Sequence, residues 1–159
     1  MNPHPLYKLG GSMKSAARMA LMATMVFSGA AWGQDAIGYV KTVAGDATVT
    51  DGGKAIKAVA GTPVKLNSVM KTGAKGTMGV TFKDNSVMSF GPDTEVTVDE
   101  YLYAPAKGDL KFGASMSKGA LNVVSGAIAK LKHEAVSLKT PTGTIGVRGT
   151  NFAVKIEPQ

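Results

Sequence analysis

The sequence contains no cysteine, which excludes disulfide bonds, thiolate metal sites and thiol nucleophiles. Aromatic residues are also scarce, at 6% of the chain, and no run of lysine and arginine occurs. Proteins that bind nucleic acid usually combine clustered basic residues with stacking aromatics, so we expect no nucleic-acid partner. Without disulfides, the stability of the fold must come from packing alone.

Motifs that carry catalytic chemistry are absent as well. The sequence shows no P-loop, zincin helix or nucleophile elbow. His133 is the one histidine after residue 33, and it lies between two charged residues, so we expect it to be exposed. The acids near turns lack the alternating spacing of a calcium loop; they are Asp84, Asp93, Asp99 and Glu100. We therefore expect no enzyme activity, no metal and no cofactor.

Residues 1–33 have the composition of a secretory signal peptide. Lys14 and Arg18 precede an uncharged stretch of apolar and small residues, and Ala31 and Gly33 are the small residues that signal peptidase reads before Gln34. The stretch is about half the length of a membrane-spanning helix, which makes an uncleaved anchor the less favoured alternative. We expect cleavage after Gly33, with Met13 as an alternative start of translation.

The remaining residues, 34–159, are expected to form one periplasmic or secreted domain without a membrane anchor. No second apolar run long enough to span a bilayer follows the leader. The net charge of the chain is +7, and cleavage lowers it by three because Lys8, Lys14 and Arg18 leave while all 11 acids stay. The remaining lysines are scattered, as on solvated strand faces.

The domain sequence predicts short β-strands separated by turns. Phe152, Val154 and Ile156 alternate with Ala153 and Lys155, which predicts a half-buried strand. Similar alternation occurs in the segments 47–50, 78–82, 86–90 and 94–98. Turn residues lie at 51–53, 83–85, 91–93 and 107–109, and the asparagine at 85 suits the left-handed conformation of a hairpin turn.

Two further segments bear on the architecture. Residues 120–132 have a composition compatible with a helix, but Val123, Val124 and Ile128 favour a strand. Residues 70–80 resemble residues 138–147, which predicts two similar turn-and-strand units unless the likeness is a coincidence in a chain with 20 glycines. We predict an all-β single domain of short strands, similar to a β-solenoid or roll, with a β-sandwich as the alternative.

Several segments resemble the FecR-type periplasmic domain. They are Gly45-Asp46-Ala47-Thr48-Val49, Lys71-Thr72-Gly73, the stretch from Val80 to Ser86 with Gly91-Pro92, and Thr140-Pro141 followed by Gly146-Val147-Arg148-Gly149-Thr150-Asn151-Phe152. The likeness extends over nearly the whole chain after residue 33, and the closing string is its most specific part. It implies a β-rich domain on the periplasmic side of anti-sigma regulators. In that family a signal passes from an outer-membrane receptor, typically for iron chelates, through a membrane helix to control of a sigma factor.

The sequence departs from that layout because it shows no cytoplasmic segment and no spanning helix before the domain. We therefore expect the resemblance to imply the domain and its compartment, and not the anti-sigma activity. On this basis the chain is expected to be a non-enzymatic binding or scaffolding module in envelope signalling, with an envelope or outer-membrane protein as its partner. The alternative is a binding protein for a small ligand such as a saccharide or a ferric chelate.

Arg148 is the main candidate for binding, because it is the one arginine after residue 33. Its planar fork could hold an anionic group, with Gly146 and Gly149 letting a backbone come close. The favoured alternative is a structural clamp on carbonyls or on an acid such as Asp84 or Asp93. In that case the Thr150 side chain would cap the strand end or form a hydrogen bond to nearby backbone.

Tyr101 and Tyr103 are the second candidate. Residues two apart in a strand share a face, so the two rings could form a surface for a sugar or a peptide. Packing at the edge of the core is the favoured alternative, because the chain has few other bulky residues.

Overall fold

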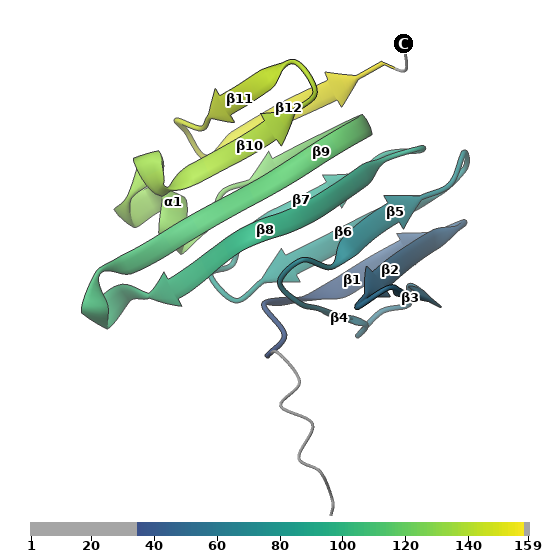
Figure 1. Cartoon of the computed structure of the whole chain (residues 1–159), viewed down its shortest axis with the longest axis horizontal. Helices are drawn as coiled ribbons and strands as arrows, with labels where there is room; N and C mark the ends of the chain where they lie inside the picture. The colour runs from purple at the N-terminus through teal and green to yellow at the C-terminus, as the bar shows by residue number, and fades with distance from the viewer. Residues whose placement is uncertain (1–34, 158–159) are drawn as a thin grey trace, which may run out of the picture. The chain divides into compact units, whose positions relative to one another are not determined.

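The computed structural model describes residues 35–157, so the predictions for Met13 and for the cleavage residues Ala31, Gly33 and Gln34 lie outside the described part. Within it the chain is mostly strand, with one short α-helix, and the prediction of an all-β single domain is confirmed (Figure 1). No helix in this range is long and apolar enough to cross a membrane.

The strands are β1 (Gly38–Ala44), β2 (Ala47–Asp51), β3 (Lys54–Lys57), β4 (Pro63–Val64), β5 (Val69–Thr72), β6 (Thr77–Phe82), β7 (Val87–Phe90), β8 (Glu95–Ala104), β9 (Asp109–Val124), β10 (Val136–Thr140), β11 (Gly143–Gly146) and β12 (Asn151–Ile156). The helix α1 spans Ala127–Leu131, and two 3-10 turns span Pro105–Lys107 and His133–Ala135.

Strand β9 belongs to both halves of a rolled sheet. Its first part pairs with β8 on one side and, in parallel, with β10 on the other, while its last part pairs with β7 and β12. One half-sheet therefore has the order β3-β2-β5-β8-β9-β10-β11, and the other has the order β4-β1-β6-β7-β9-β12. In Figure 1, β8 and the first part of β9 lie in front of β7 and β6.

The chain bends from one half-sheet to the other at Gly119, which has φ +98°. A β-carbon at this position would collide with the backbone of Thr94, so both the conformation and the space require glycine. Thr94 is fully buried, and its hydroxyl accepts the N–H of Ala120 at 3.0 Å. The same hydroxyl lies 2.9 Å from the carbonyl of Gly91. This buried threonine therefore ties the bend of β9 to the turn before β8.

The core lies between the two half-sheets and is rich in methionine. Met70 and Met116 come from one half-sheet and Met78 and Met88 from the other, and each side chain is at most 3% exposed. Methionine is flexible enough to fill the irregular space between two curved layers. Branched and aromatic residues complete the core, among them Val40, Val49, Val80, Phe82, Phe90, Val96, Val98, Phe112, Leu121, Val123 and Leu138.

The predicted strands at 47–50, 78–82, 86–90 and 152–156 are confirmed within about two residues at each end, and the one at 94–98 is confirmed at its start but continues to Ala104. The left-handed conformation of Asn85 is confirmed at φ 64°. The strand prediction for 120–132 is correct to Val124 and wrong beyond it, because 127–131 form α1. Tertiary contacts decide this: the N–H of Ala127 bonds the Asp84 carbonyl at 2.7 Å, and Ile128 is fully buried.

The two similar segments do not form two equivalent units. In the first, β5 pairs with β2 and β8, while β6 pairs with β1 and β7, so its two strands lie in different half-sheets. In the second, β10 and β11 pair with each other as a hairpin. The expectation of a structural repeat is therefore wrong, since the partner strands and not the local sequence decide where each copy lies.

Candidate functional site

Asp84 and Tyr101 come together inside the fold. Asp84 is fully buried, and its carboxylate accepts hydrogen bonds from the N–H and hydroxyl of Ser86, at 3.2 and 2.7 Å, and from the hydroxyl of Tyr101, at 3.2 Å. The N–H of Ile128 lies 3.4 Å from the same carboxylate. These donors satisfy the buried charge internally and link the 83–85 turn to β8 and α1.

The ring of Tyr101 packs at the edge of the core, as the favoured interpretation expects. Its centroid lies 5.4 Å from that of Phe112 and 6.0 Å from that of Phe82. Burial raises the pKa of Tyr101 well above its usual range, and the nearby Asp84 charge raises it further. Tyr103 remains 38% exposed. The two tyrosines therefore do not form one exposed aromatic surface.

Arg148 lies on the surface, in the connection from β11 to β12. Among residues 35–157 its side chain makes no hydrogen bond and no ion pair, so the structure gives no internal clamp to Asp84 or Asp93. Gly149 has φ +122°, a conformation that favours glycine. The bond that Thr150 makes is long-range and not the expected local one, because its carbonyl accepts the N–H of Ser125, 25 residues earlier, at 2.8 Å.

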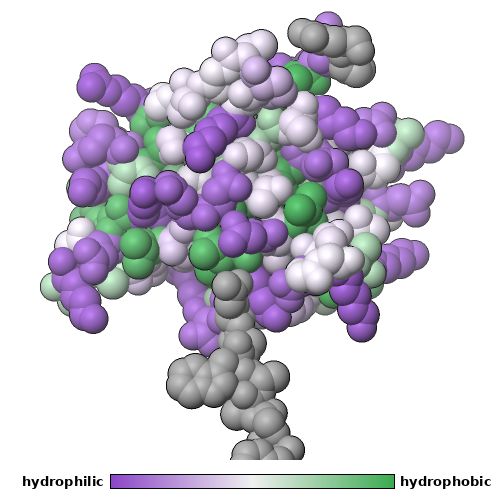
Figure 2. All heavy atoms as spheres, viewed as in Figure 1, coloured by the Kyte–Doolittle hydropathy of each residue, from purple (hydrophilic) through white to green (hydrophobic). Residues whose placement is uncertain are grey.

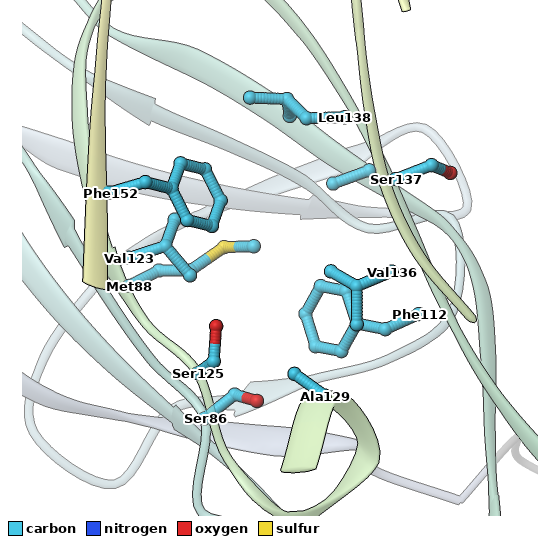
Figure 3. Close-up of a pocket in the computed structure, with 11 residues that line it drawn as sticks. Ser86, Met88, Phe112, Val123, Ser125, Ala129, Val136, Ser137, Leu138 and Phe152 are labelled. Atoms are coloured by element: carbon cyan, nitrogen blue, oxygen red, sulfur yellow. The ribbon is translucent and has the colours of Figure 1, made fainter. Parts of the chain in front are cut away.

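A seam between β12 and the hairpin β10–β11 leaves the rolled sheet open on one side. Strand β12 pairs with β9 alone and β11 with β10 alone among the described strands. Phe152 of β12 and the β10 residues from Val136 to Leu138 lie on opposite sides of a small cavity (Figure 3). Its volume is about 10 Å³, the space of one water molecule. The cavity is therefore too small for a saccharide or a chelate.

The side chain of Ser125 points into this cavity (Figure 3). It is 5% exposed, and its hydroxyl has no hydrogen-bond partner among the described residues. Apolar groups form most of the remaining wall, including Met88, Phe112 and Val123. The sequence offered no signal for this serine, because it lies outside every motif.

The outer face of the half-sheet that contains β8 is polar and charged. Figure 2 shows hydrophilic side chains over most of this face, with small apolar patches between them. Two of its ion pairs join neighbouring strands: Lys71 with Glu95 at 3.1 Å, and Lys111 with Glu100 at 3.0 Å. Such exposed pairs contribute little stability, and they are typical of a solvated sheet face.

A hollow of about 490 Å³ lies where the β11–β12 connection begins. It is lined by His133, Glu134, Val136, Ser137, Gly146, Val147 and Arg148. His133 is exposed, as predicted, and its Nδ1 lies 3.7 Å from the Glu134 carboxylate. Sequence reasoning did not connect residues 133 and 134 with Arg148, because they are brought together by the hairpin and not by spacing.

The comparison with protein families identifies the chain. The family model described as FecR protein matches residues 68–159, which is more than half of the chain and covers β5 to β12. The segment 45–49, which also resembles the family, lies outside the match. No curated protein and no solved structure matches the sequence. The chain therefore belongs to the FecR protein family, which implies a signalling-related domain.

Proposed function

We propose that this domain is a non-enzymatic module of envelope signalling that binds a protein partner by accepting a strand of that partner at the free edge of β12. The leader-like composition of residues 1–33 supports export to the periplasm, where an envelope or outer-membrane protein would supply the strand. The observation that carries the proposal is the regular outer edge of β12, which pairs with no strand among residues 35–157.

The other three outermost strands of the rolled sheet are short or carry residues that disfavour pairing. Strand β4 has two residues and includes Pro63, which has no N–H to donate. Strand β3 has four residues and carries Lys54 and Lys57, the side chains that natural edge strands use against unwanted pairing. Strand β11 has four residues, of which two are glycine. Strand β12 has six residues, no proline and an unbroken register with β9.

The register identifies the backbone groups that β12 offers. The Thr150 carbonyl accepts the N–H of Ser125, and the β12–β9 register continues this pairing, so Phe152, Val154 and Ile156 direct their N–H and C=O groups toward β9. The alternate residues, including Ala153, direct theirs away from β9. These outward groups are the donors and acceptors that an added strand requires.

The side chains of β12 favour the same use. Phe152, Val154 and Ile156 are only partly buried, although they pack against the core. An added strand would cover the exposed part of this apolar row if it carried apolar residues at alternate positions. Partner binding would therefore combine backbone hydrogen bonds with burial of an apolar surface that the chain leaves half open.

Proline scanning of two edges tests the proposal. We would introduce the photo-crosslinking residue p-benzoylphenylalanine at Asn151 in cells that make the full chain, and compare Ala153→Pro with Ala55→Pro. Both alanines are exposed, and the Ala58 N–H bond to the Ala47 carbonyl shows that Ala55 also directs its N–H outward from β3. Each substitution therefore removes one outward donor and no bond of the sheet.

We expect one discrete crosslinked protein, whose yield falls at least about tenfold in Ala153→Pro and stays unchanged in Ala55→Pro. Thermal melting of both variants checks that the fold is intact. Equal yields in the two proline variants, or no crosslinked protein at all, would contradict strand addition at β12.

A further inference from the structure

The two neighbours of Arg148 in the connection from β11 to β12 determine the direction in which its side chain leaves the backbone. Val147, the preceding residue, is 5% exposed, and its N–H bonds the Val136 carbonyl at 3.3 Å. Gly149, the following residue, takes a conformation that other residues rarely adopt. The buried side chain on one side and the glycine on the other direct the Arg148 side chain outward, at the end of the seam where β12 begins.

Arg148 makes no ion pair with an acid within residues 35–157. The lysines that do make ion pairs there are Lys65, Lys71, Lys111 and Lys155. Glu134 is the one acid among the residues that line the hollow, and its carboxylate lies 3.7 Å from His133 Nδ1 and forms no ion pair with Arg148. The exposed Lys130 and Lys132 add positive charge just before His133. This end of the seam therefore favours an anionic group.

The floor of the hollow leaves room for such a group. Ser137 and Gly146 face each other across β10 and β11, and a β-carbon at Gly146 would meet no atom within 4 Å. Packing within the chain therefore does not require glycine at this position. Because Gly146 has no side chain, the hollow beside the guanidinium stays open. A guanidinium binds a carboxylate through two parallel N–H···O bonds, which gives it direction as well as strength.

We infer that Arg148 binds a carboxylate of the partner and thereby orients the added strand antiparallel to β12. This inference rests on the proposed function. A strand antiparallel to β12 ends beside Asn151, next to Arg148, so its C-terminal carboxylate or an acidic side chain near its end reaches the hollow. A parallel strand would instead bring its amino-terminal end, whose positive charge Arg148 repels.

Peptide binding to the full chain tests the inference. The probe is a hexapeptide of alternating threonine and valine in three forms: with a free C-terminal carboxylate, with a C-terminal amide, and as the amide with aspartate as its last residue. Nuclear magnetic resonance follows the Ala153 amide, which reports strand addition, and the Arg148 Nε–H, which reports the carboxylate. Arg148→Lys keeps the charge and loses the fork, Arg148→Gln loses both, and Lys139→Gln is the control for loss of an exposed charge.

We expect the carboxylate form to bind about five- to tenfold more tightly than the amide, an advantage that both Arg148 variants lose and Lys139→Gln keeps. If the aspartate form binds more tightly than the plain amide, an acidic side chain can supply the carboxylate that Arg148 binds. If the form with the free C-terminus binds more tightly, the end of the chain can supply it. Equal affinity of all forms, or no binding of any, overturns the inference. If the amide binds the wild type but not Ala153→Pro, use of the β12 edge stands even when Arg148 has no effect.

Discussion

Tyr101 and Asp84 illustrate how a polar pair can stabilise an apolar core. The Tyr101 hydroxyl donates to the Asp84 carboxylate and accepts the Asp84 N–H at 2.9 Å, so both groups are satisfied at the edge of the core. The sequence placed Asp84 correctly in a turn, from the neighbouring asparagine. Its link to Tyr101 could not be predicted, because a partner 17 residues away depends on how β8 lies against the turn.

The raised pKa of Tyr101 predicts a loss of stability in alkali. Both states are neutral at this residue below about pH 10, and above it the unfolded tyrosine ionises while the folded one keeps its proton. The unfolded state is then favoured, so the free energy of unfolding falls as the pH rises, by up to about 1.4 kcal/mol per pH unit. Urea denaturation between about pH 8 and pH 11 measures this slope.

The Tyr101→Phe variant removes the titrating hydroxyl. It should be less stable than the wild type at neutral pH, by about 1 kcal/mol from the lost hydrogen bond, and should lose less stability in alkali. Tyr103→Phe removes an exposed hydroxyl without touching Asp84 and should leave the wild-type behaviour in place. An unchanged alkaline slope in Tyr101→Phe would show that another group causes it.

Among the elements, β9 was the hardest to predict. Alternation identified short strands elsewhere, but in this 16-residue strand Gly113 and Gly119 interrupt it, and small residues replace β-branched ones. Strand β8 shows a related effect: a register shift between Val98 and Glu100 inserts Asp99, which brings odd-numbered Tyr101 to the face of even-numbered Val98. A period of two cannot detect a bend or a bulge, because each one changes the parity of the pattern.

Replacing Gly119 by alanine tests the bend in β9. Alanine at this position would have to adopt a left-handed backbone conformation, and its methyl group would collide with Thr94. We therefore expect a loss of about 3 kcal/mol or more in the free energy of unfolding. Gly108→Ala is the matched control: its φ is +73°, but no atom lies within 4 Å of its β-carbon. The free energy of unfolding of this control variant should fall by about 1 kcal/mol. Similar losses in the two variants would show that the contact with Thr94 does not matter.

At the scale of the whole molecule, the class of fold followed from the sequence and the path of the sheet did not. Turn residues and alternation are local, and they sufficed for an all-β domain. Strands β7 and β12 pair with opposite edges of the same part of β9. Val87 and Asn151, which are more than 60 residues apart, both lie opposite Val124. The open seam, and with it the candidate site, depends on this long-range pairing.

Because the two half-sheets share β9 and one core, we expect the domain to unfold in a single transition. The methyl groups of Met70 and Met78 report on opposite half-sheets. Their native resonances should disappear at the same urea concentration, together with the far-ultraviolet circular dichroism signal. Two separate midpoints would mean that the half-sheets fold independently despite the shared strand.

The methionine-rich core also has a consequence for oxidative chemistry. Every thioether among residues 35–157 is enclosed between the half-sheets, and oxidation to the sulfoxide requires peroxide to reach the sulfur. Peroxide can reach these sulfurs only when the half-sheets separate transiently. A sulfoxide is polar, so its presence in the core would oppose the return of the half-sheets to their native packing. Each event would therefore leave a covalent mark on a molecule that had opened, and the mass of the protein after a timed exposure to peroxide would count those openings.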